Sequence, residues 1–300
     1  MSTRDENQRG AKKPRRDQRS ERQSEREQED RSFTSVIVKR TDEAMRHPDD
    51  VLDLAIREGE AQAKRRVASL VLSAVGAGAI LAFTALAVGV MSQITGAGEA
   101  SPLMERLSTA LVYPLGFVLC LMSRTQLFTE HTALAVYPVL DRKCGVSAML
   151  RVWGLVLAGN LAGCVLGAVL LYGASGVVQA SDGFAAVAEH TLGFGTVDTL
   201  LSAVLAGWLM ALGGWLLLAT PPDFSQIVVI YMATFLIGLG GLHHSIAGAS
   251  ELLTARFTGA DVPLARAAAT IGLAVIGNLA GGALFVAVLN YGHVRQTQSD

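Results

Sequence analysis

The chain has 300 residues, of which 51% are hydrophobic and 17% charged, and its formal net charge is −1. Residues 1–66 carry 32 of its 51 charged side chains. The other 234 residues contain charge-free apolar runs long enough to cross a bilayer, and this excludes an ordinary soluble globular protein.

Residues 1–40 consist mainly of Arg, Glu, Gln, Asp and Ser. Because such a segment has almost no apolar surface to bury, the sequence predicts a disordered, charged N-terminal tail. A basic arm that binds nucleic acid is the poorer interpretation, because acidic residues nearly cancel the basic ones and no aromatic residues are interleaved with them. We therefore expect no nucleic-acid partner.

An amphipathic juxtamembrane helix is predicted within residues 41–66. Pro48 suits a first helical position, and Asp49 and Asp50 suit the positive end of the helix dipole. An apolar stripe follows, made of Val51, Leu52, Ala55 and Ile56.

Six membrane spans account for the hydropathy. Five charge-free runs cover residues 67–91, 152–181, 199–222, 224–250 and 267–294. A sixth, 107–123, is interrupted at Arg124 and resumes weakly at 131–140. The predicted fold is an all-α polytopic membrane protein, with a six-span transport domain at 67–295 and a C-terminal tail at 296–300.

The distribution of Lys and Arg predicts a location in the cell (inner or plasma) membrane with both termini cytoplasmic. Arg142, Lys143 and Arg295 then join the N-terminal basic residues inside, and the acidic loop 174–198 lies outside. Arg256 and Arg266 would also face outside, which is a mild contradiction that the larger N-terminal cluster outweighs.

The chain contains an internal repeat. Gly159-Asn160-Leu161-Ala162-Gly163 in the third span recurs as Gly277-Asn278-Leu279-Ala280-Gly281 in the sixth, 118 residues later. The same offset carries the interruption at Leu127-Phe128-Thr129 to Ser245-Ile246-Ala247 in the fifth run. Because three crossings separate the copies, the sequence predicts two inverted three-helix repeats with broken second and fifth helices, and a pathway between the repeats.

Polar side chains at the two interruptions are the first candidates for a transport path, because polar groups in hydrocarbon usually face a pore or the bundle interior. Thr129 and Ser245 supply hydroxyls, and His243 and His244 lie side by side within the fifth run. Adjacent helical residues point about 100° apart, so we expect only one of the two histidines to line the path. For every one of these residues the alternative role is a hydrogen bond to nearby backbone.

Asn160 and Asn278 are further candidates. Each sits in a Gly-x-x-x-Gly stretch, which lets two helices approach closely. The amides either contact substrate or bond the backbone that is freed at the neighbouring breaks, and the sequence fits both roles equally well.

Charged residues near these positions complete the candidate set. Arg151 opens the third span, where it either snorkels to the cytoplasmic interface or makes a vestibule positive. Arg124, Glu130 and Glu251 cluster near the two breaks in the sequence, and an Arg–carboxylate pair that holds the loop is the expected arrangement. No phosphate-binding loop, metal-ligand set or catalytic nucleophile stands out, so we predict no cofactor, no metal and no enzyme.

The order of these motifs resembles the formate/nitrite transporter family. The resemblance spans residues 50–295 and rests on Leu127-Phe128-Thr129, on the two Gly-Asn-Leu-Ala-Gly stretches and on the run from Gly241 to Ala247. It implies a homopentamer in the lipid bilayer with an aquaporin-like fold and one pore in each protomer.

The same resemblance implies roles for individual residues. His244 takes the place of the central pore histidine, and Thr129 that of its hydroxyl partner. Leu127 and Phe128 would form the cytoplasmic constriction with Phe117. The remaining assignments are Tyr113 and Ile237 at the outer constriction, Arg151 where many members have lysine, and Asn160 as a vestibule asparagine.

The sequence also departs from the family pattern. The histidine motif usually ends in Ala-Asn-Met and here reads Ala247-Gly248-Ala249; His243 stands where an acid is common, and Glu130 follows the second-span loop. We predict transport of small monovalent anions or weak acids, such as formate or nitrite, with or without a coupled proton. The alternatives are a channel for small neutral or cationic solutes, and a non-conducting membrane scaffold that displays residues 1–66.

Overall fold

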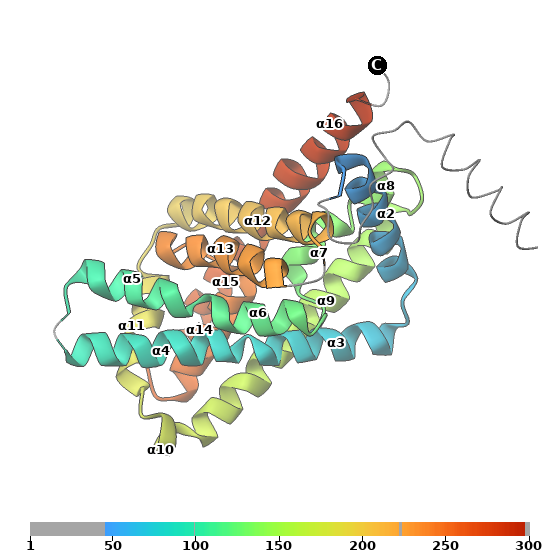
Figure 1. The fold of residues 1–300 in the computed structure, drawn as a ribbon. Coiled ribbons are helices and arrows are strands. Elements are labelled where there is room, and N and C mark those ends of the chain that lie inside the picture. Colours follow the sequence, from blue (N-terminus) through green and yellow to red (C-terminus); the bar gives the residue numbers. More distant parts are fainter. Residues whose placement is uncertain (1–45, 99, 222–223, 298–300) are drawn as a thin grey trace, which may run out of the picture. The chain divides into compact units, whose positions relative to one another are not determined.

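A computed structural model describes residues 46–98, 100–221 and 224–297. The predicted tail at residues 1–40 therefore lies outside the described residues. Within them the chain forms helices and connecting loops and no strands, as expected for an all-α membrane protein (Figure 1).

Five helical stretches are long and apolar enough to cross a membrane. The bent pair α13–α14 adds one more when it is taken as one span, and it is the fifth span in chain order. The first stretch is α3 (Val67–Ile80) with α4 (Ala82–Ala97), and the second is α5 (Pro102–Val112) with α6 (Pro114–Met122). The third and fourth are α9 (Val146–Gly173) and α12 (Thr196–Ala219), and the sixth runs through α15 (Leu264–Gly282), the π-helix η1 (Ala283–Val288) and α16 (Leu289–Thr297).

The second and fifth spans are broken, as the repeat predicts. After α6 the chain leaves the helix and resumes as the short helices α7 (Phe128–Leu134) and α8 (Tyr137–Leu140). In the fifth span, α13 (Phe224–Gly240) and α14 (Ser245–Phe257) meet at an angle of 58°. Each break falls at the polar motif that marks it in the sequence.

The loop predicted at 174–198 is instead largely helical. It contains α10 (Ser175–Val178) and α11 (Ser181–Leu192). The aromatic ring of Phe184 is buried against α4 at Gly89, where any larger residue would overlap the ring. This tertiary contact gives a segment of weak hydropathy enough buried surface to form a helix.

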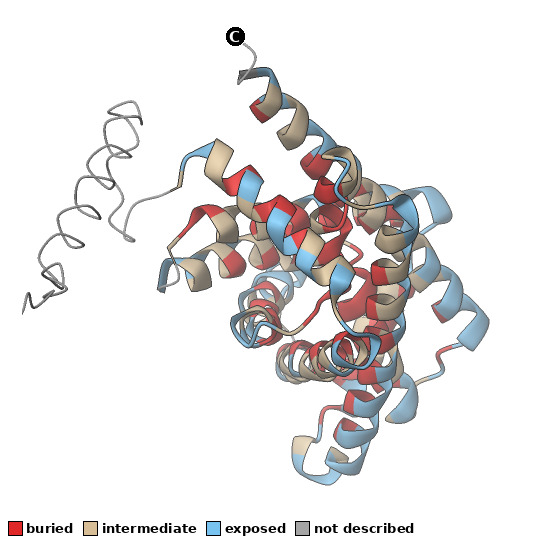
Figure 2. Cartoon of the chain, turned by 90° about the vertical axis from the view of Figure 1, so that its right-hand side faces the viewer, coloured by how far each residue is buried: buried red, intermediate tan, exposed pale blue. Residues whose placement is uncertain are grey.

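Helix α2 (Pro48–Lys64) begins at the proline that the sequence indicates. Its stripe of Val51, Leu52, Ala55 and Ile56 is buried (Figure 2), and the last three pack in a cluster with residues of α7 and α8. Gly59 lies against the carbonyl of Leu134, so a side chain there would overlap backbone. The helix is therefore packed onto the spans by its apolar face.

The glycine stripes close the helix pairs inside one chain. Gly159 and Gly163 of α9 lie against the backbone and small side chains of α3, and Gly167 lies against the junction of α3 and α4 at Ala82. Gly277 and Gly281 of α15 lie in the same way against α12. The Gly-x-x-x-Gly stretches thus let α9 approach α3 and α15 approach α12 within one chain.

Replacing Gly163 with leucine should therefore destabilise the protomer, because a Cβ there would overlap the Val75 carbonyl and the Ala79 amide. Overpacking at such a site costs about 1–3 kcal/mol. Thermal unfolding in detergent measures the loss. Gly154→Leu is the matched control on the same helix, since a Cβ at Gly154 meets no atom within 4 Å; equal losses for the two variants would contradict this account.

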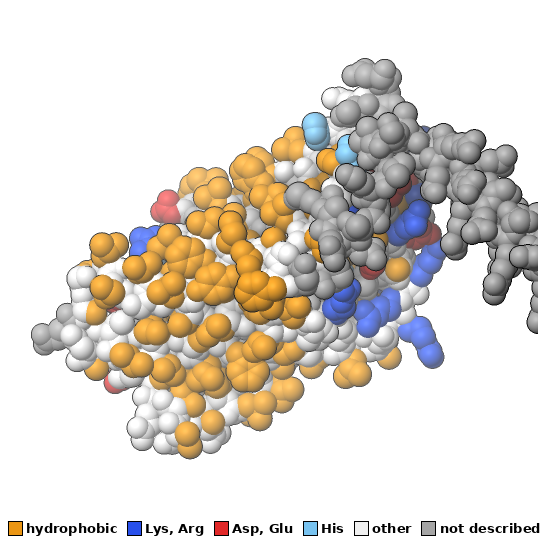
Figure 3. All heavy atoms as spheres, viewed as in Figure 1, with side chains coloured by type: hydrophobic (Ala, Val, Ile, Leu, Met, Phe, Trp, Pro, Cys, Tyr) orange, Lys and Arg blue, Asp and Glu red, His pale blue; other side chains and the backbone are white. Residues whose placement is uncertain are grey.

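The surface divides into an apolar region and a basic end. Exposed Leu, Val, Phe and Met side chains cover the spans, and Lys and Arg side chains gather at the end that carries α2 (Figure 3). Such an apolar exterior is expected where helices face lipid rather than water.

Candidate transport path

The two breaks are held by one asparagine each, in matching ways. Asn160 of α9 accepts a hydrogen bond from the Phe128 amide (2.8 Å) and donates to the carbonyls of Ala74 and Gln126. Asn278 of α15 accepts from the Ser245 amide (2.8 Å) and donates to the carbonyls of Ala203 and His243. Both amides are fully buried, so of their two expected roles these contacts match the bonding of freed backbone.

These bonds also correct the repeat offset at the breaks. Phe128 matches Ser245 by its bond to the asparagine, which is an offset of 117 rather than 118. The left-handed residues Arg124 (φ 55°) and Gly241 (φ 60°) obey the same offset. The second repeat thus has one more residue between its break and its asparagine, and His244 is the counterpart of Leu127.

Thr129 and His244 meet at the centre of the fold. The Thr129 Oγ1 and His244 Nε2 atoms are 2.8 Å apart, and both residues are buried. The ring of Phe117 lies edge-on to the His244 imidazole, with centroids 4.9 Å apart. Leu127 and Phe128 are also fully buried here, and we call these five residues the septum.

The hydrogen bonds of His244 fit a neutral ring. His244 caps α14, because its Nδ1 atom accepts a hydrogen bond from the Ala247 amide (3.1 Å). An accepting Nδ1 carries no proton, so the ring proton is on Nε2 and is donated to Thr129. A second proton on Nδ1 would face the Ala247 N–H and the positive end of the helix, and both oppose it.

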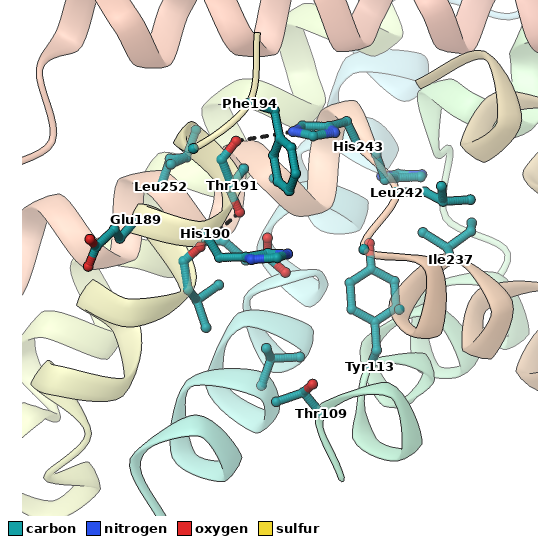
Figure 4. A pocket seen from close by; sticks show the side chains of 18 of the residues that line it. Thr109, Tyr113, Glu189, His190, Thr191, Phe194, Ile237, Leu242, His243 and Leu252 are labelled. Carbon is teal, nitrogen blue, oxygen red and sulfur yellow. Dashed lines mark hydrogen bonds between the residues drawn. The ribbon is translucent and has the colours of Figure 1, made fainter. Parts of the chain in front are cut away.

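A cavity of about 720 Å³ lies on the α11 side of the septum, and we call it the α11 cavity. Tyr113, Ile237 and His243 line it (Figure 4). His244 lines it too, together with Ser245 and Glu251 from α14. Phe194 stands between His190 and His243, edge-on to both rings. The predicted outer constriction residues Tyr113 and Ile237 are thus placed beside this cavity.

A second cavity of about 570 Å³ lies on the side of α2, and we call it the α2 cavity. Its ionisable lining side chains are Arg46, Glu58, Arg65, Arg124, Glu130, His131 and Tyr137. The septum residues Phe117, Leu127, Phe128 and Thr129 are absent from the described linings of both cavities. His244 lines the α11 cavity, and Gln126 and Glu130, which flank residues 127–129 in the chain, line the α2 cavity, so the septum lies between the two cavities.

The charged candidates do not form the expected ion pair. Arg124 and Glu130 line the α2 cavity and Glu251 lines the α11 cavity. Among the residues that the structure describes, Arg124 forms no ion pair within 4 Å with either carboxylate. The predicted Arg–carboxylate pair is therefore wrong, because the hydrogen bonds of Asn160 and Asn278 hold the two breaks instead.

Arg151 has a role that the sequence did not suggest. Its guanidinium donates to the carbonyls of Ala63 (3.0 Å) and Arg65 (3.1 Å) at the C-terminal end of α2. It does not belong to the described lining of either cavity. A cation at the negative end of a helix is stabilising, so Arg151 fastens α2 to α9.

Sequence reasoning missed two pairs of polar side chains, the first buried and the second partly buried. Gln126 Oε1 and His131 Nε2 are 2.6 Å apart beside the α2 cavity, and Ser202 Oγ and His243 Nδ1 are 2.6 Å apart beside the α11 cavity. Gln126 and His131 lie next to the Leu-Phe-Thr motif in the chain, and this proximity could have marked them as candidates. Ser202 lies in an apolar run with no motif around it.

Comparison with known proteins is consistent with this architecture. The formate/nitrite transporter family model matches residues 49–292. The chain belongs to the formate/nitrite transporter family. Inner membrane protein YfdC of Escherichia coli K12 is 30% identical over 81% of this chain and 78% of its own length. A probable formate transporter of Methanothermobacter thermautotrophicus is 24% identical over 82% of this chain and 96% of its own length.

Solved structures share the fold. An FNT family ion channel superposes with a TM-score of 0.75 at 18% identity, covering 82% of this chain and 99% of its own. A pentameric formate channel with formate bound superposes with a TM-score of 0.66 at 19% identity, covering 76% of this chain and 98% of its own. As a member of the formate/nitrite transporter family, the chain has the helical membrane fold that its sequence predicts.

Proposed function

We propose that the protein is a homopentameric membrane channel or transporter, and not an enzyme, in which each chain passes small monovalent anions as their weak acids through the septum. The observation that carries the proposal is the Thr129–His244 hydrogen bond, which lies in a fully buried ring between two polar cavities. Membership of the formate/nitrite transporter family supports it independently.

The neutral acid is the form that the septum favours. Phe117, Leu127 and Phe128 supply only apolar side chains there, and an unpaired anion in such surroundings carries a large desolvation cost. An undissociated acid has no net charge and can exchange hydrogen bonds with Thr129 Oγ1 and His244 Nε2 as it passes.

Flux into proteoliposomes tests this proposal. Above the pKa of the acid, the undissociated fraction falls about tenfold per pH unit, so we expect formate uptake to fall in the same proportion. Stopped-flow recording with an internal pH dye measures it, and protein-free vesicles correct for leakage. Uptake that is independent of pH would mean that the anion itself crosses.

The orientation that we propose places α2, and with it both termini, in the cytoplasm. Arg46, Lys64, Arg65 and Arg295 lie at the α2 end, as the positive-inside rule requires. The two basic residues that oppose this orientation are engaged locally: Arg256 donates to the Val262 carbonyl and Arg266 to the Leu192 carbonyl. These local hydrogen bonds support the proposed orientation, because each gives a basic side chain on the outer side a partner.

The assembly is proposed from the likeness to the pentameric formate channel. Native mass spectrometry in mild detergent should give a mass of five chains. A stable monomer would contradict the pentamer without affecting the proposed path, because both cavities and the septum lie within one chain.

A channel for small cations is the second candidate, and the carboxylates of Glu130 and Glu251 favour it, since one lines each cavity. Methylammonium flux in the same vesicles separates the two functions. If no anion, acid or cation crosses while residues 1–66 capture a partner protein, the scaffold function is correct instead.

A further inference from the structure

The α11 cavity has an open space beside α14, one turn beyond the septum. A Cβ built on Gly248 meets no heavy atom within 4 Å, and Gly248 lines this cavity. His244, Gly248 and Glu251 follow one another at four and three residues, so they share one face of the helix. Glu251 therefore lies about 10 Å from His244 along the helix axis.

Two unpartnered polar side chains lie at this space. The hydroxyl of Ser245 is fully buried and has no hydrogen-bond partner, and Ser245 lines the cavity. Glu251 is only 9% exposed, and no described residue forms a hydrogen bond or ion pair with its carboxylate. Buried polar groups are normally satisfied, so a donor and acceptor left open beside empty space indicate a ligand.

We propose that the space over Gly248 is a binding subsite for a small carboxylic or nitrous acid, and that the carboxyl group of Glu251 exchanges the proton of this substrate. The inference rests on the proposed function and deepens it, because it assigns the proton exchange to Glu251 and not to His244. The hydroxyl of Ser245 hydrogen-bonds the substrate from the septum side.

The proton exchange balances without any other reactant. A substrate anion that enters from the α11 side takes the proton of the Glu251 carboxylic acid, which leaves the neutral substrate acid and the Glu251 carboxylate. Hydronium from the cavity water then reprotonates the carboxylate and leaves water. Entry from the other side runs the same two steps in reverse.

The surroundings of Glu251 favour a supply of protons. Glu105 and Arg106 of α5 and Glu189 of α11 line the same cavity, so beside the Glu251 carboxylic acid it holds two carboxylates and one guanidinium. The other ionisable groups that face α14 are Tyr113, His190, His243 and the Cys164 thiol of α9, which donates to the Ile246 carbonyl. Net negative charge in a cavity raises the local concentration of cations, including hydronium.

The test compares variants of the full-length protein in proteoliposomes with a formate gradient and an internal pH dye. Glu251→Gln keeps the shape of the side chain but cannot exchange a proton, and Glu189→Gln is its charge-matched control in the same cavity. Gly248→Leu fills the subsite, and Gly272→Leu is its control on α15, at a glycine with equally open surroundings. Ser245→Ala is paired with Ser250→Ala, another buried hydroxyl of α14 without a partner.

We expect Glu251→Gln to lower formate flux about tenfold or more and to change its pH profile, because the glutamine amide cannot give or take the substrate proton. Gly248→Leu should lower flux as strongly, Ser245→Ala less, and each control should stay close to the parent. Parent-like flux and pH profile in Glu251→Gln would overturn the inference, and so would an equal loss in Glu189→Gln, which would indicate a general field effect. If Glu251→Gln does not assemble, the variants at Gly248 and Ser245 and their controls test the subsite.

The inference and the proposed function fail in different ways. If the parent passes no small acid at any pH, the proposed function is wrong before any variant is compared. If the parent passes formate and the three variants at the subsite do so equally well, the function stands and the subsite is wrong.

Discussion

Replacing Asn278 with leucine should abolish transport and strongly destabilise the protein. The Asn278 amide makes three hydrogen bonds, to the Ser245 amide and to the carbonyls of Ala203 and His243. Leucine has a similar size but leaves all three backbone groups buried and unpaired, at about 1–3 kcal/mol each. Thermal unfolding in detergent and formate flux measure the two effects.

Two further variants make this prediction specific. Asn278→Asp keeps the acceptor for the Ser245 amide but places a buried carboxyl group against the carbonyls of Ala203 and His243, so it should be at least as harmful as leucine. Asn290→Leu on α16 is the control, because among the described hydrogen bonds the Asn290 side chain holds no backbone group. The account would be wrong if the two leucine variants lost stability equally.

Replacing His244 with leucine should lower formate flux at least about a hundredfold, because the septum then loses both the helix cap and its only ring donor toward Thr129. His244→Asn should do much less harm. Asparagine is a good N-cap and retains a neutral N–H donor, so the variant should be slower than the parent with a pH profile of the same shape. Stopped-flow uptake over a range of pH measures both quantities.

The neighbouring histidine provides the control for this series. The His243 ring is bonded to Ser202 and to the Thr191 carbonyl and has no contact with Thr129 among the described hydrogen bonds. His243→Asn should therefore keep most of the flux. A lost pH dependence in His244→Asn would show that the imidazole titrates during transport, against the neutral ring that the Ala247 bond favours.

Much of the fold follows from local patterns in the sequence. Runs without charge are sufficient to locate spans, because a charged side chain in hydrocarbon is expensive whatever surrounds it. The two Gly-Asn-Leu-Ala-Gly stretches are sufficient to reveal the repeat and the broken helices. The stripe of α2 and its N-terminal proline are equally local, and the helix begins where they indicate.

The sequence by itself thus determined the membrane class, the breaks and the pairing of Thr129 with His244, the last through a resemblance to the formate/nitrite transporter family. The tertiary structure alone decided which partner each polar group has. From the sequence, Arg151 could lie at a vestibule or at the membrane interface. In the structure, the end of α2 lies close enough for Arg151 to donate to the carbonyls of Ala63 and Arg65. Glu130 and Glu251 lie near the two breaks in the sequence but face different cavities, because the septum lies between them. Hydrogen bonds depend on distance and direction in space, and spacing along the chain does not specify either for residues on different helices.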